Sequence, residues 1–334
     1  MKSLVIAEKP SVARDIARVL HCSQKGNGTL EGKDYVVTWA LGHLVTLADP
    51  EEYDKKYTKW ELSTLPMMPE KMKLVVIRQT SKQYNAVKTQ LYRKDIGEII
   101  IATDAGREGE LVARWILDKS GCHKPIRRLW ISSVTDKAIK EGFAHLKDGR
   151  AYNDLYHAAR SRAEADWLVG INATRALTCK YNAQLSCGRV QTPTLAMIAH
   201  REQQIRSFKP EDYYGLRCTT SVTGGSVGTM ASIVTWTWQQ KKSGSLRSFN
   251  KDLITGLDKK LKNQTLTVTD VHTSSKRTPS PGLYDLTELQ RDANKRFGFS
   301  AKETLNIMQS LYEHHKVLTY PRTDSRYIGT DIVP

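Results

Sequence analysis

The sequence predicts a multidomain protein that combines an α/β domain with α-helical domains. Over residues 1–150, short apolar runs rich in β-branched residues alternate with amphipathic segments, as in a largely parallel sheet covered by helices. After that region a long stretch has helical periodicity and no strand pattern. The chain has 334 residues, of which 40% are hydrophobic, so it is long enough for more than one core.

The first region, residues 1–150, holds the strand candidates SLVIA, YVVTWA, LVVI, EIIIATD and RRLWISS. Helix candidates lie between them, at Ser11–Leu20, in REGELVARWILDK and in TDKAIKEGF. Parallel strands end at one edge of their sheet, and in open α/β sheets function gathers outside the carboxyl ends of the strands. We therefore expect one domain here, with its functional residues at that edge.

The rest of the chain divides into three parts. Residues 151–212 read as helical, with one helix over Asn153–Arg175 and another from near Thr192, after the loop LSCGRV. Residues 213–278 look β-rich, with a Gly-, Ser- and Lys-rich stretch that we interpret as a flexible hairpin or linker. Helical periodicity returns in residues 279–334, in LTELQRDANKRF and SAKETLNIMQSLYE.

Charge and composition narrow the class of protein. Lys and Arg total 51 against 35 acidic residues, a formal charge of +16, which favours a polyanionic partner: nucleic acid first, an anionic membrane surface second. Charge alone does not choose between them, because many basic proteins simply have a solvated positive face. The five cysteines form no C-x-x-C pair, so we expect reduced thiols in a cytoplasmic protein rather than a zinc or redox motif.

Several classes of protein are excluded. The apolar run at the N-terminus is too short for a signal peptide, and no stretch is long and apolar enough to span a membrane. The string GNGTLEGKD has glycines and a lysine but not the spacing of a phosphate-binding loop, so no ATP requirement follows.

Acidic residues follow two of the predicted strands. Glu8 and Lys9 come after SLVIA, while Asp104 and Glu108 follow the strand in EIIIATD. Carboxylates that meet at one sheet edge can hold Mg²⁺, which prefers oxygen ligands. Taken singly, Asp104 could only cap the following helix, and Glu108 could be a first-turn acid favoured by the helix dipole.

A tyrosine near the end of the chain is the candidate nucleophile. A phenol has a pKa of about 10, so Tyr320 in LTYPRTDS attacks a phosphodiester only where neighbours stabilise the developing charge. Arg322 suits a phosphate because its guanidinium can bind two oxygens. Without further context, Tyr320 could equally be a packed aromatic residue at a turn.

Two strings in the helical part suggest nucleic-acid contacts. Arg162 and Asp166 are four residues apart on one helical face, a spacing also typical of a surface ion pair. In SCGRVQTPTL, Gly188 permits close approach of the backbone, and polar side chains offer donors to phosphate or base. The donors are Arg189, Gln191 and Thr194.

Taken together, these strings resemble bacterial type IA DNA topoisomerases, of the topoisomerase III subfamily. The strings AEKPSVA and DAGREGE together look like the Toprim domain, which type II topoisomerases, primases and some nucleases share. The segment that carries the nucleophilic tyrosine in the family resembles a second, longer string, LTELQRDANKRFGFSAKETLNIMQSLYEHHKVLTYPRTDS. Pro321 and the AEKPSVA start favour topoisomerase III over topoisomerase I. The resemblance covers nearly the whole chain except the part around Thr223–Phe249.

The resemblance implies a Toprim domain at 1–150, a helical DNA-binding part at 151–212, a β-rich gate segment at 213–278 and an incomplete tyrosine domain at 279–334. It implies catalytic roles for Tyr320, Glu8, Lys9 and Arg322, and a Mg²⁺ site at Glu8, Asp104 and Glu108. DNA binding is implied for Arg162, Asp166, Ser186, Cys187, Gly188, Arg189, Val190, Gln191 and Thr194. Gly106 stands where the family usually has a middle aspartate, so one Mg²⁺ is expected rather than two.

The activity implied is ATP-independent cutting of one strand through a 5′-phosphotyrosyl link, then strand passage and religation, which relaxes and decatenates DNA. The expected partners are single-stranded and negatively supercoiled DNA, in the cytoplasm at the nucleoid. In the family the polypeptide continues beyond the tyrosine motif, so a truncated chain is expected. A non-catalytic fragment that binds single-stranded DNA therefore stays open, as does another Toprim enzyme, which leaves Tyr320 without a role.

Overall fold

The computed structural model describes residues 1–131, 133–222, 232–265, 267, 269–270 and 272–328. Contacts divide the chain into two units. Unit 1 comprises Met1–Pro193 and Ser280–Pro334, and unit 2 comprises Thr194–Pro279. Each unit is described by itself below, and the predicted domain boundaries at residues 150, 212 and 278 stay predictions.

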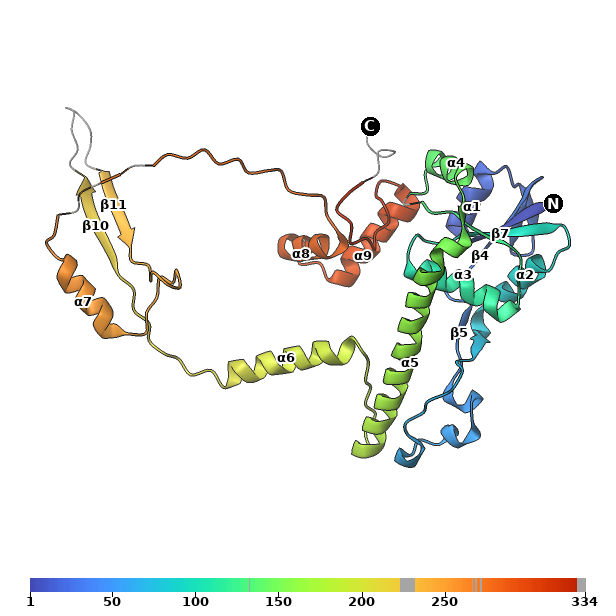
Figure 1. Cartoon of the computed structure of the whole chain (residues 1–334), viewed down its shortest axis with the longest axis horizontal. Helices are drawn as coiled ribbons and strands as arrows, with labels where there is room; N and C mark the ends of the chain where they lie inside the picture. Colours follow the sequence, from blue (N-terminus) through green and yellow to red (C-terminus); the bar gives the residue numbers. More distant parts are fainter. Residues whose placement is uncertain (132, 223–231, 266, 268, 271, 329–334) are drawn as a thin grey trace. The chain divides into compact units, whose positions relative to one another are not determined.

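Unit 1 is built on a seven-stranded sheet in its described residues, with the order β2-β3-β4-β1-β7-β8-β9 (Figure 1). The strands are β1 (Lys2–Ala7), β2 (Gln24–Gly26), β3 (Thr29–Glu31), β4 (Tyr35–Trp39), β7 (Ile96–Ala102), β8 (Ile126–Arg128) and β9 (Lys147–Asp148). The four central strands β4, β1, β7 and β8 run parallel, whereas β2, β3 and β9 are antiparallel additions at the two edges.

One strand candidate lies outside this sheet. The LVVI run forms β6 (Leu74–Val76), which pairs antiparallel with β5 (Val45–Leu47) in a separate two-stranded sheet. Its expected place in the parallel sheet was therefore wrong.

Helices cover both faces of the central sheet, which is why its strands are almost continuously apolar. Leu4 and Ile6 of β1 pack in one cluster with α2 (Ser81–Leu91) and α3 (Arg107–Ser120). The alternate residues of β1, Val5 and Ala7, pack in the other cluster with α1 (Pro10–Val19) and α4 (Asp136–Ala144). Because both clusters are buried, the register of β1 is fixed from both sides.

The helix α5 (Asn153–Tyr181) starts against α3, where Tyr156 and Ala159 are buried in the same cluster as the sheet. Farther along, α5 holds the segment between β5 and β6, in which lie the short turns η1 (Pro50–Glu52), η2 (Lys55–Thr58) and η3 (Leu62–Thr64). The Asn172 side chain accepts from Met67 N at 2.6 Å and donates to Met67 O at 3.0 Å. The segment is thus fastened along the helix.

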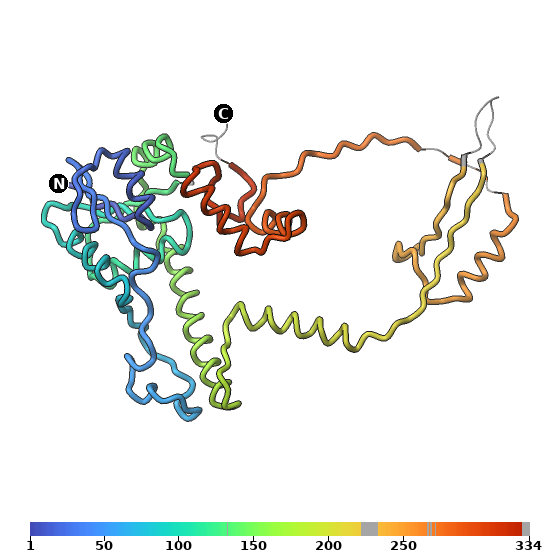
Figure 2. Tube along the Cα trace, turned by 180° about the vertical axis from the view of Figure 1, so that it is seen from behind, coloured from blue at the N-terminus to red at the C-terminus, as the bar shows by residue number. Residues whose placement is uncertain are grey.

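Residues 280–328 of unit 1 contain α8 (Leu286–Phe297), α9 (Ala301–Ser310) and a π-helical turn, η6 (Leu311–His315), seen in red in Figure 2. The N-caps follow the expected chemistry: Asp285 accepts from Glu288 N and Ser300 from Glu303 N. This segment contacts the sheet region through Lys316 of the chain after η6, whose Nζ lies 2.7 Å from Asp15 Oδ2 on α1.

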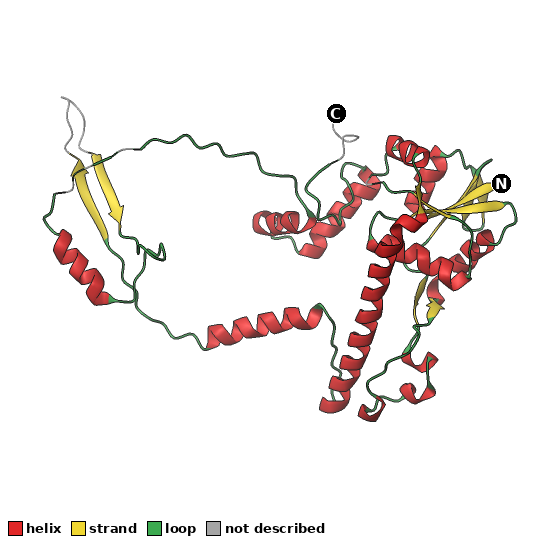
Figure 3. Ribbon diagram, in the orientation of Figure 1, coloured by secondary structure: helices red, strands yellow, loops and turns green. Residues whose placement is uncertain are grey.

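Unit 2 begins within α6 (Gln191–Arg206), most of which belongs to it. The strands β10 (Arg217–Val222) and β11 (Ser232–Thr237) form an antiparallel pair. The β-rich prediction missed α7 (Lys251–Leu261), drawn as a red helix in Figure 3, which Asn250 caps by accepting from Leu253 N at 3.0 Å. The hairpin or linker expected around Thr223–Phe249 falls partly on residues 223–231, which lie outside the described residues.

No helix in the described part of the chain is long and apolar enough to cross a membrane.

Candidate active site

Two carboxylates meet at the carboxyl edge of the sheet. In the parallel pair of β1 and β7, Ala7 is the register partner of Ala102, so the residues after both strands leave the sheet side by side. Glu8 Oε2 accepts a hydrogen bond from Asp104 N at 3.0 Å. The chain runs from β1 to one side of the sheet and later returns to the other side with β7, so the pair lies at a topological switch point, where ligands bind in such sheets.

Burial raises the pKa of both acids. Burial first, and then the charge of Asp104, raise the pKa of Glu8 to about 7, against the lowering effects of the Asp104 backbone, Lys9 and Arg128. Burial also raises the pKa of Asp104, although Lys9 and the hydrogen bond from Tyr320 work against it. Glu8 therefore holds a proton for roughly half the time near neutral pH, as a general acid requires.

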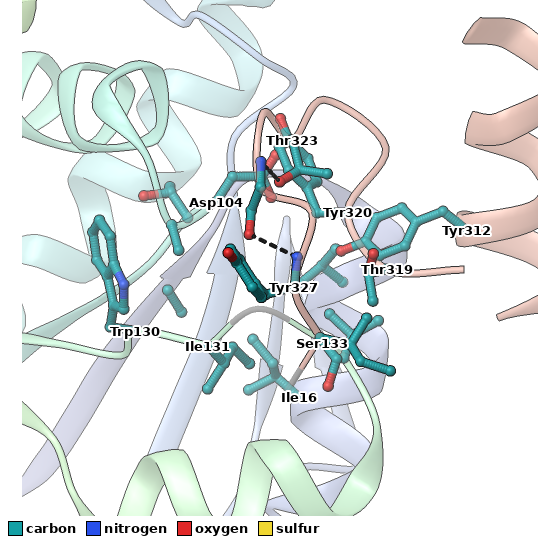
Figure 4. A pocket seen from close by; sticks show the side chains of 17 residues that line it. Ile16, Asp104, Trp130, Ile131, Ser133, Tyr312, Thr319, Tyr320, Thr323 and Tyr327 are labelled. Atoms are coloured by element: carbon teal, nitrogen blue, oxygen red, sulfur yellow. Dashed lines mark hydrogen bonds between the residues drawn. The ribbon is translucent and has the colours of Figure 1, made fainter. Parts of the chain in front are cut away.

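Tyr320 reaches this pair from the segment after η6. Its hydroxyl is close enough to the Asp104 carboxylate for the two groups to shift each other's pKa, and Figure 4 draws the two side chains in one pocket with Tyr312. Burial, the charges of Asp104 and Glu8 and the hydrogen-bonding interaction with Asp104 raise the pKa of the Tyr320 phenol, while Arg322 lowers it. The phenol is thus neutral in this state, so a positively charged partner is needed to make it a nucleophile.

A cavity of about 880 Å³ joins these groups with the other predicted residues. Seven predicted site residues line it: Glu8, Lys9, Asp104, Glu108, Arg162, Tyr320 and Arg322. They come from β1, β7, α3, α5 and the segment after η6, so the fold gathers at one cavity residues that are far apart in the sequence.

Lys9 has a partner that the sequence analysis missed. Its Nζ lies 2.9 Å from Glu313 Oε1, and both side chains are largely shielded from solvent. Burial pushes the pKa of Glu313 up, but the hydrogen bonds from Gln309 and Lys9 outweigh it and the pKa is lowered. In the sequence, Glu313 is marked only by its place seven residues before Tyr320, which is a weak indication of a partner for Lys9.

Glu108 lies apart from the other two acids. It occupies the first turn of α3, where its side chain is 63% exposed, 3.7 Å from His43 Nε2 and 4.0 Å from Arg162 Nη1. Among the described residues, no three His, Cys, Asp or Glu side chains are grouped to hold a metal ion. The structure therefore brings Glu8 and Asp104 together but does not add Glu108 to them.

Arg128 is a second residue that the sequence analysis missed. It is fully buried, with Nε 2.9 Å from Glu110 Oε2 and its other nitrogens donating to backbone carbonyls. The acceptors are Ile101 O at 3.1 Å, Thr103 O at 2.8 Å, Leu129 O at 2.6 Å and Asp104 O at 2.7 Å. Arg128 thereby fixes the turn that presents Asp104. Nothing in the string RRLWISS distinguishes this arginine from its neighbour.

The predicted DNA-binding residues lie on α5, on the loop after it and in the first turn of α6. Asp166 faces both Arg162, at 3.9 Å, and Arg189, whose Nη2 is 3.3 Å from Asp166 Oδ2. The loop is held to the same helix by Cys187 N, which donates to Thr174 Oγ1 at 2.9 Å. Arg189 is exposed, as are Ser186, Val190, Gln191 and Thr194.

The space around Gly188 would accommodate a side chain. A Cβ there would meet Gln191 at 3.6 Å, which is an ordinary contact. Contacts within the chain therefore do not explain this glycine.

Comparison with known families agrees with this arrangement. Residues 3–134 match the Toprim domain, and residues 150–333, more than half of the chain, match the family described as DNA topoisomerase. The protein thus combines a Toprim domain with a topoisomerase core. The chain belongs to the DNA topoisomerase family.

Individual relatives indicate the subfamily of DNA topoisomerases that the chain resembles. The chain is 67% identical over 332 residues to DNA topoisomerase 3 of Bacillus cereus strain ATCC 14579, covering 99% of this chain and 44% of that protein. It is 63% identical over 333 residues to DNA topoisomerase 3 of Bacillus subtilis strain 168, covering all of this chain and 44% of the relative. The predicted resemblance to the topoisomerase III subfamily is confirmed, and the chain spans less than half the length of these curated relatives.

A solved structure shows the same fold. Full-length topoisomerase I from Thermotoga maritima superposes with a TM-score of 0.65 at 23% identity, covering 98% of this chain and 50% of that one. The predicted fold class, a Toprim α/β domain combined with helical and β-containing parts, is thereby confirmed.

Proposed function

We propose that this chain carries the strand-cleaving centre of a type IA DNA topoisomerase of the topoisomerase III kind. The observation that carries the proposal is the convergence of the Tyr320 phenol on the Glu8–Asp104 pair, at the carboxyl ends of β1 and β7. Another Toprim enzyme would use the acidic pair but would give Tyr320 no role.

In the proposed reaction the Tyr320 oxygen attacks a backbone phosphorus, forming a 5′-phosphotyrosyl bond as the bond to the 3′-oxygen breaks. Asp104, the carboxylate nearest in its effect on the Tyr320 phenol, accepts the phenolic proton. Glu8, with a pKa of about 7, gives a proton to the leaving 3′-oxygen. The reverse proton transfers accompany rejoining, so the two strand ends reseal without ATP.

Lys9 and Arg322 are the proposed phosphate ligands. Both line the cavity that holds Tyr320, and Arg322 already lowers the pKa of the phenol. A phosphate between them would be held by two positive charges, which stabilise the charge that develops during attack.

The acidic pair also fits a single Mg²⁺. Glu8 and Asp104 are adjacent, partly buried carboxylates, and carboxylate oxygens are the donors that Mg²⁺ prefers. When bound, the ion supplies positive charge near the phosphate. With Gly106 in place of a middle acid, we propose one ion, held by Asp104, with Glu108 as the remaining candidate ligand and with Glu8 as a ligand once it has given up its proton.

We propose that single-stranded DNA lies along α5 and the loop Ser186–Val190, with Arg162 and Arg189 on its phosphates. Both arginines share Asp166, so their guanidinium groups are aligned before DNA arrives. Single-stranded and negatively supercoiled DNA are the proposed substrates, which places the protein at the nucleoid.

A second function, binding of single-stranded DNA without cleavage, is favoured by two features. Lys9 is engaged by Glu313, and the pKa of Tyr320 is raised. Such a state would bind DNA but would not cut it until Lys9 is released.

One experiment separates these functions. The chain is incubated with single-stranded oligonucleotides labelled at the 5′ or the 3′ end, quenched with denaturant and examined for covalent adduct. We expect adduct on the 3′-side fragment for the wild type, none for Tyr320→Phe and at least a 100-fold lower yield for Asp104→Asn. Binding without any adduct would support the second function.

A further inference from the structure

We propose that Tyr312 is a positioning residue for the nucleophile: its ring holds the Tyr320 ring edge to face and keeps the phenol aimed at Asp104. This inference rests on the proposed function of Tyr320. It adds a residue that neither the sequence motifs nor the comparisons assign.

The two rings are in direct contact. Their centroids lie 5.9 Å apart at an interplanar angle of 78°, an edge-to-face arrangement that aromatic pairs favour. Within the part of the chain that the structure describes, no other aromatic ring contacts Tyr320. Tyr312 is 8% exposed, so its ring offers a well-packed surface to Tyr320. Figure 4 shows both side chains lining one pocket.

The backbone around Tyr312 is anchored on three sides. α9 passes into the π-helical turn η6, a rare conformation that is frequent at functional sites. Within this turn, Glu313 Oε1 lies 2.9 Å from Lys9 Nζ. Lys316, the first residue after the turn, places its Nζ 2.7 Å from Asp15 Oδ2. Lys316 has a φ of 56°, in the left-handed region, so the turn ends sharply. Tyr312 is therefore fixed against β1 and α1.

The residues just before Tyr320 are much less anchored. Val317 is 67% exposed and Leu318 39% exposed, so the residues before the nucleophile bury little apolar surface. A phenol turns about two side-chain bonds, and attack on phosphorus requires a narrow range of both. The Tyr312 ring is the contact in place to restrict that rotation.

The ring and the hydroxyl of Tyr312 make separable contributions. Burial, and then the charges of Asp104, Glu313, Glu8 and Asp15, raise the pKa of the Tyr312 phenol, so its hydroxyl stays neutral. The contact with Tyr320 is made by the ring. Phenylalanine at position 312 is thus expected to position the nucleophile as tyrosine does.

The first test measures single-turnover cleavage and DNA affinity separately. Edge-to-face pairs contribute about 0.5–1.5 kcal/mol. At 1.36 kcal/mol for each tenfold in rate, Tyr312→Leu should slow adduct formation about 2- to 12-fold. Tyr312→Phe should restore the wild-type rate within twofold, and oligonucleotide affinity should stay unchanged in both variants. Phe297→Leu, which removes the exposed ring of Phe297 from α8, is the matched control and should leave the rate unchanged.

A second test needs neither DNA nor activity. The chain has 14 tyrosines, so 3-fluorotyrosine is incorporated and the ¹⁹F resonance of Tyr320 is identified by its loss in Tyr320→Phe. We expect this resonance to keep its position in Tyr312→Phe and to move towards the free amino acid in Tyr312→Leu.

Two results would overturn the proposal. An unmoved Tyr320 resonance in Tyr312→Leu would show that the ring does not position the phenol. A loss of cleavage in Tyr312→Phe as large as in Tyr312→Leu would assign the effect to the hydroxyl. Absence of adduct from the wild-type chain would instead contradict the proposed function, while the ¹⁹F measurement would still decide the role of Tyr312.

Discussion

Glu8 shows how function and stability compete at a single residue. Its folded pKa of about 7 lies above the ordinary value of 4.5, so the folded chain binds more protons than the unfolded chain between these two pH values. The free energy of unfolding therefore falls as pH rises from 4.5 to 7. Above pH 7 the full penalty, up to about 3 kcal/mol, is present.

Glu8→Gln should remove that penalty. We expect the variant to be more stable than the wild type at pH 8 and the difference to shrink towards zero as pH falls below 4.5, where the Glu8 carboxyl is protonated in both states. Urea unfolding with a chelator present, at several pH values, measures it. Equal stability of the two proteins at pH 8 would mean that ionised Glu8 does not destabilise the folded chain.

For Arg128 we expect the opposite effect of a substitution, a loss of stability, because its buried charge has a partner of opposite charge. Arg128→Met leaves Glu110, which is also fully buried, with only Arg114 and frees the carbonyls around Asp104. Removing one partner of a buried pair costs about 3–5 kcal/mol. Urea unfolding should show that loss, and the double variant with Glu110→Gln should recover part of it. A loss of unfolding free energy below about 1 kcal/mol would contradict the proposed role of Arg128 in fixing the turn that presents Asp104.

At the scale of elements, the ion pair between Lys9, after β1, and Glu313, in η6, controls a proposed phosphate ligand. Glu313→Gln frees Lys9 and removes a negative charge from the cavity. We expect this variant to bind a single-stranded oligonucleotide a few-fold more tightly, with the gain fading as salt increases. Fluorescence anisotropy at two salt concentrations measures it.

Glu303→Gln, an exposed acid on α9, is the matched control for Glu313→Gln and should not change affinity. An equal gain in both variants would mean that overall charge, rather than release of Lys9, is responsible.

The pairing of α5 with the loop after it leads to a further prediction. Arg189→Ala removes a proposed phosphate contact, so affinity for single-stranded DNA should fall similarly for all sequences. The slope of log affinity against log salt should decrease in size by about 0.7. Arg201→Ala, an exposed arginine on α6, is the control. A change that depends on base sequence would indicate base reading instead.

The elements also show how far the sequence was informative. The apolar runs predicted β1 and β7, and the acids that follow them predicted the Glu8–Asp104 pair, because parallel strands end at one edge. The LVVI strand was misplaced, since a short apolar run does not reveal which strand it pairs with. The helix α7 was missed although its residues are amphipathic, because the β-rich interpretation of residues 213–278 was extended across it. Glu313 and Arg128 required knowledge of contacts between distant segments.

At the scale of the whole molecule, unit 1 alone contains every group of the proposed cleavage centre. Tyr320 belongs to Ser280–Pro334 and the acids belong to Met1–Pro193, yet contacts join these stretches into one unit. The 44% of the relatives' length that this chain spans thus includes both the Toprim domain and the tyrosine motif. Cleavage can be tested on this chain separately from strand passage.

The most direct test of the central claim is chemical identification of the covalent link. The chain is reacted with a single-stranded oligonucleotide, denatured and digested, and the peptide that carries nucleotide is sequenced by mass spectrometry. We predict one modified peptide, joined through the Tyr320 oxygen to a 5′-phosphate. A link through another residue, or to a 3′-phosphate, would contradict the account.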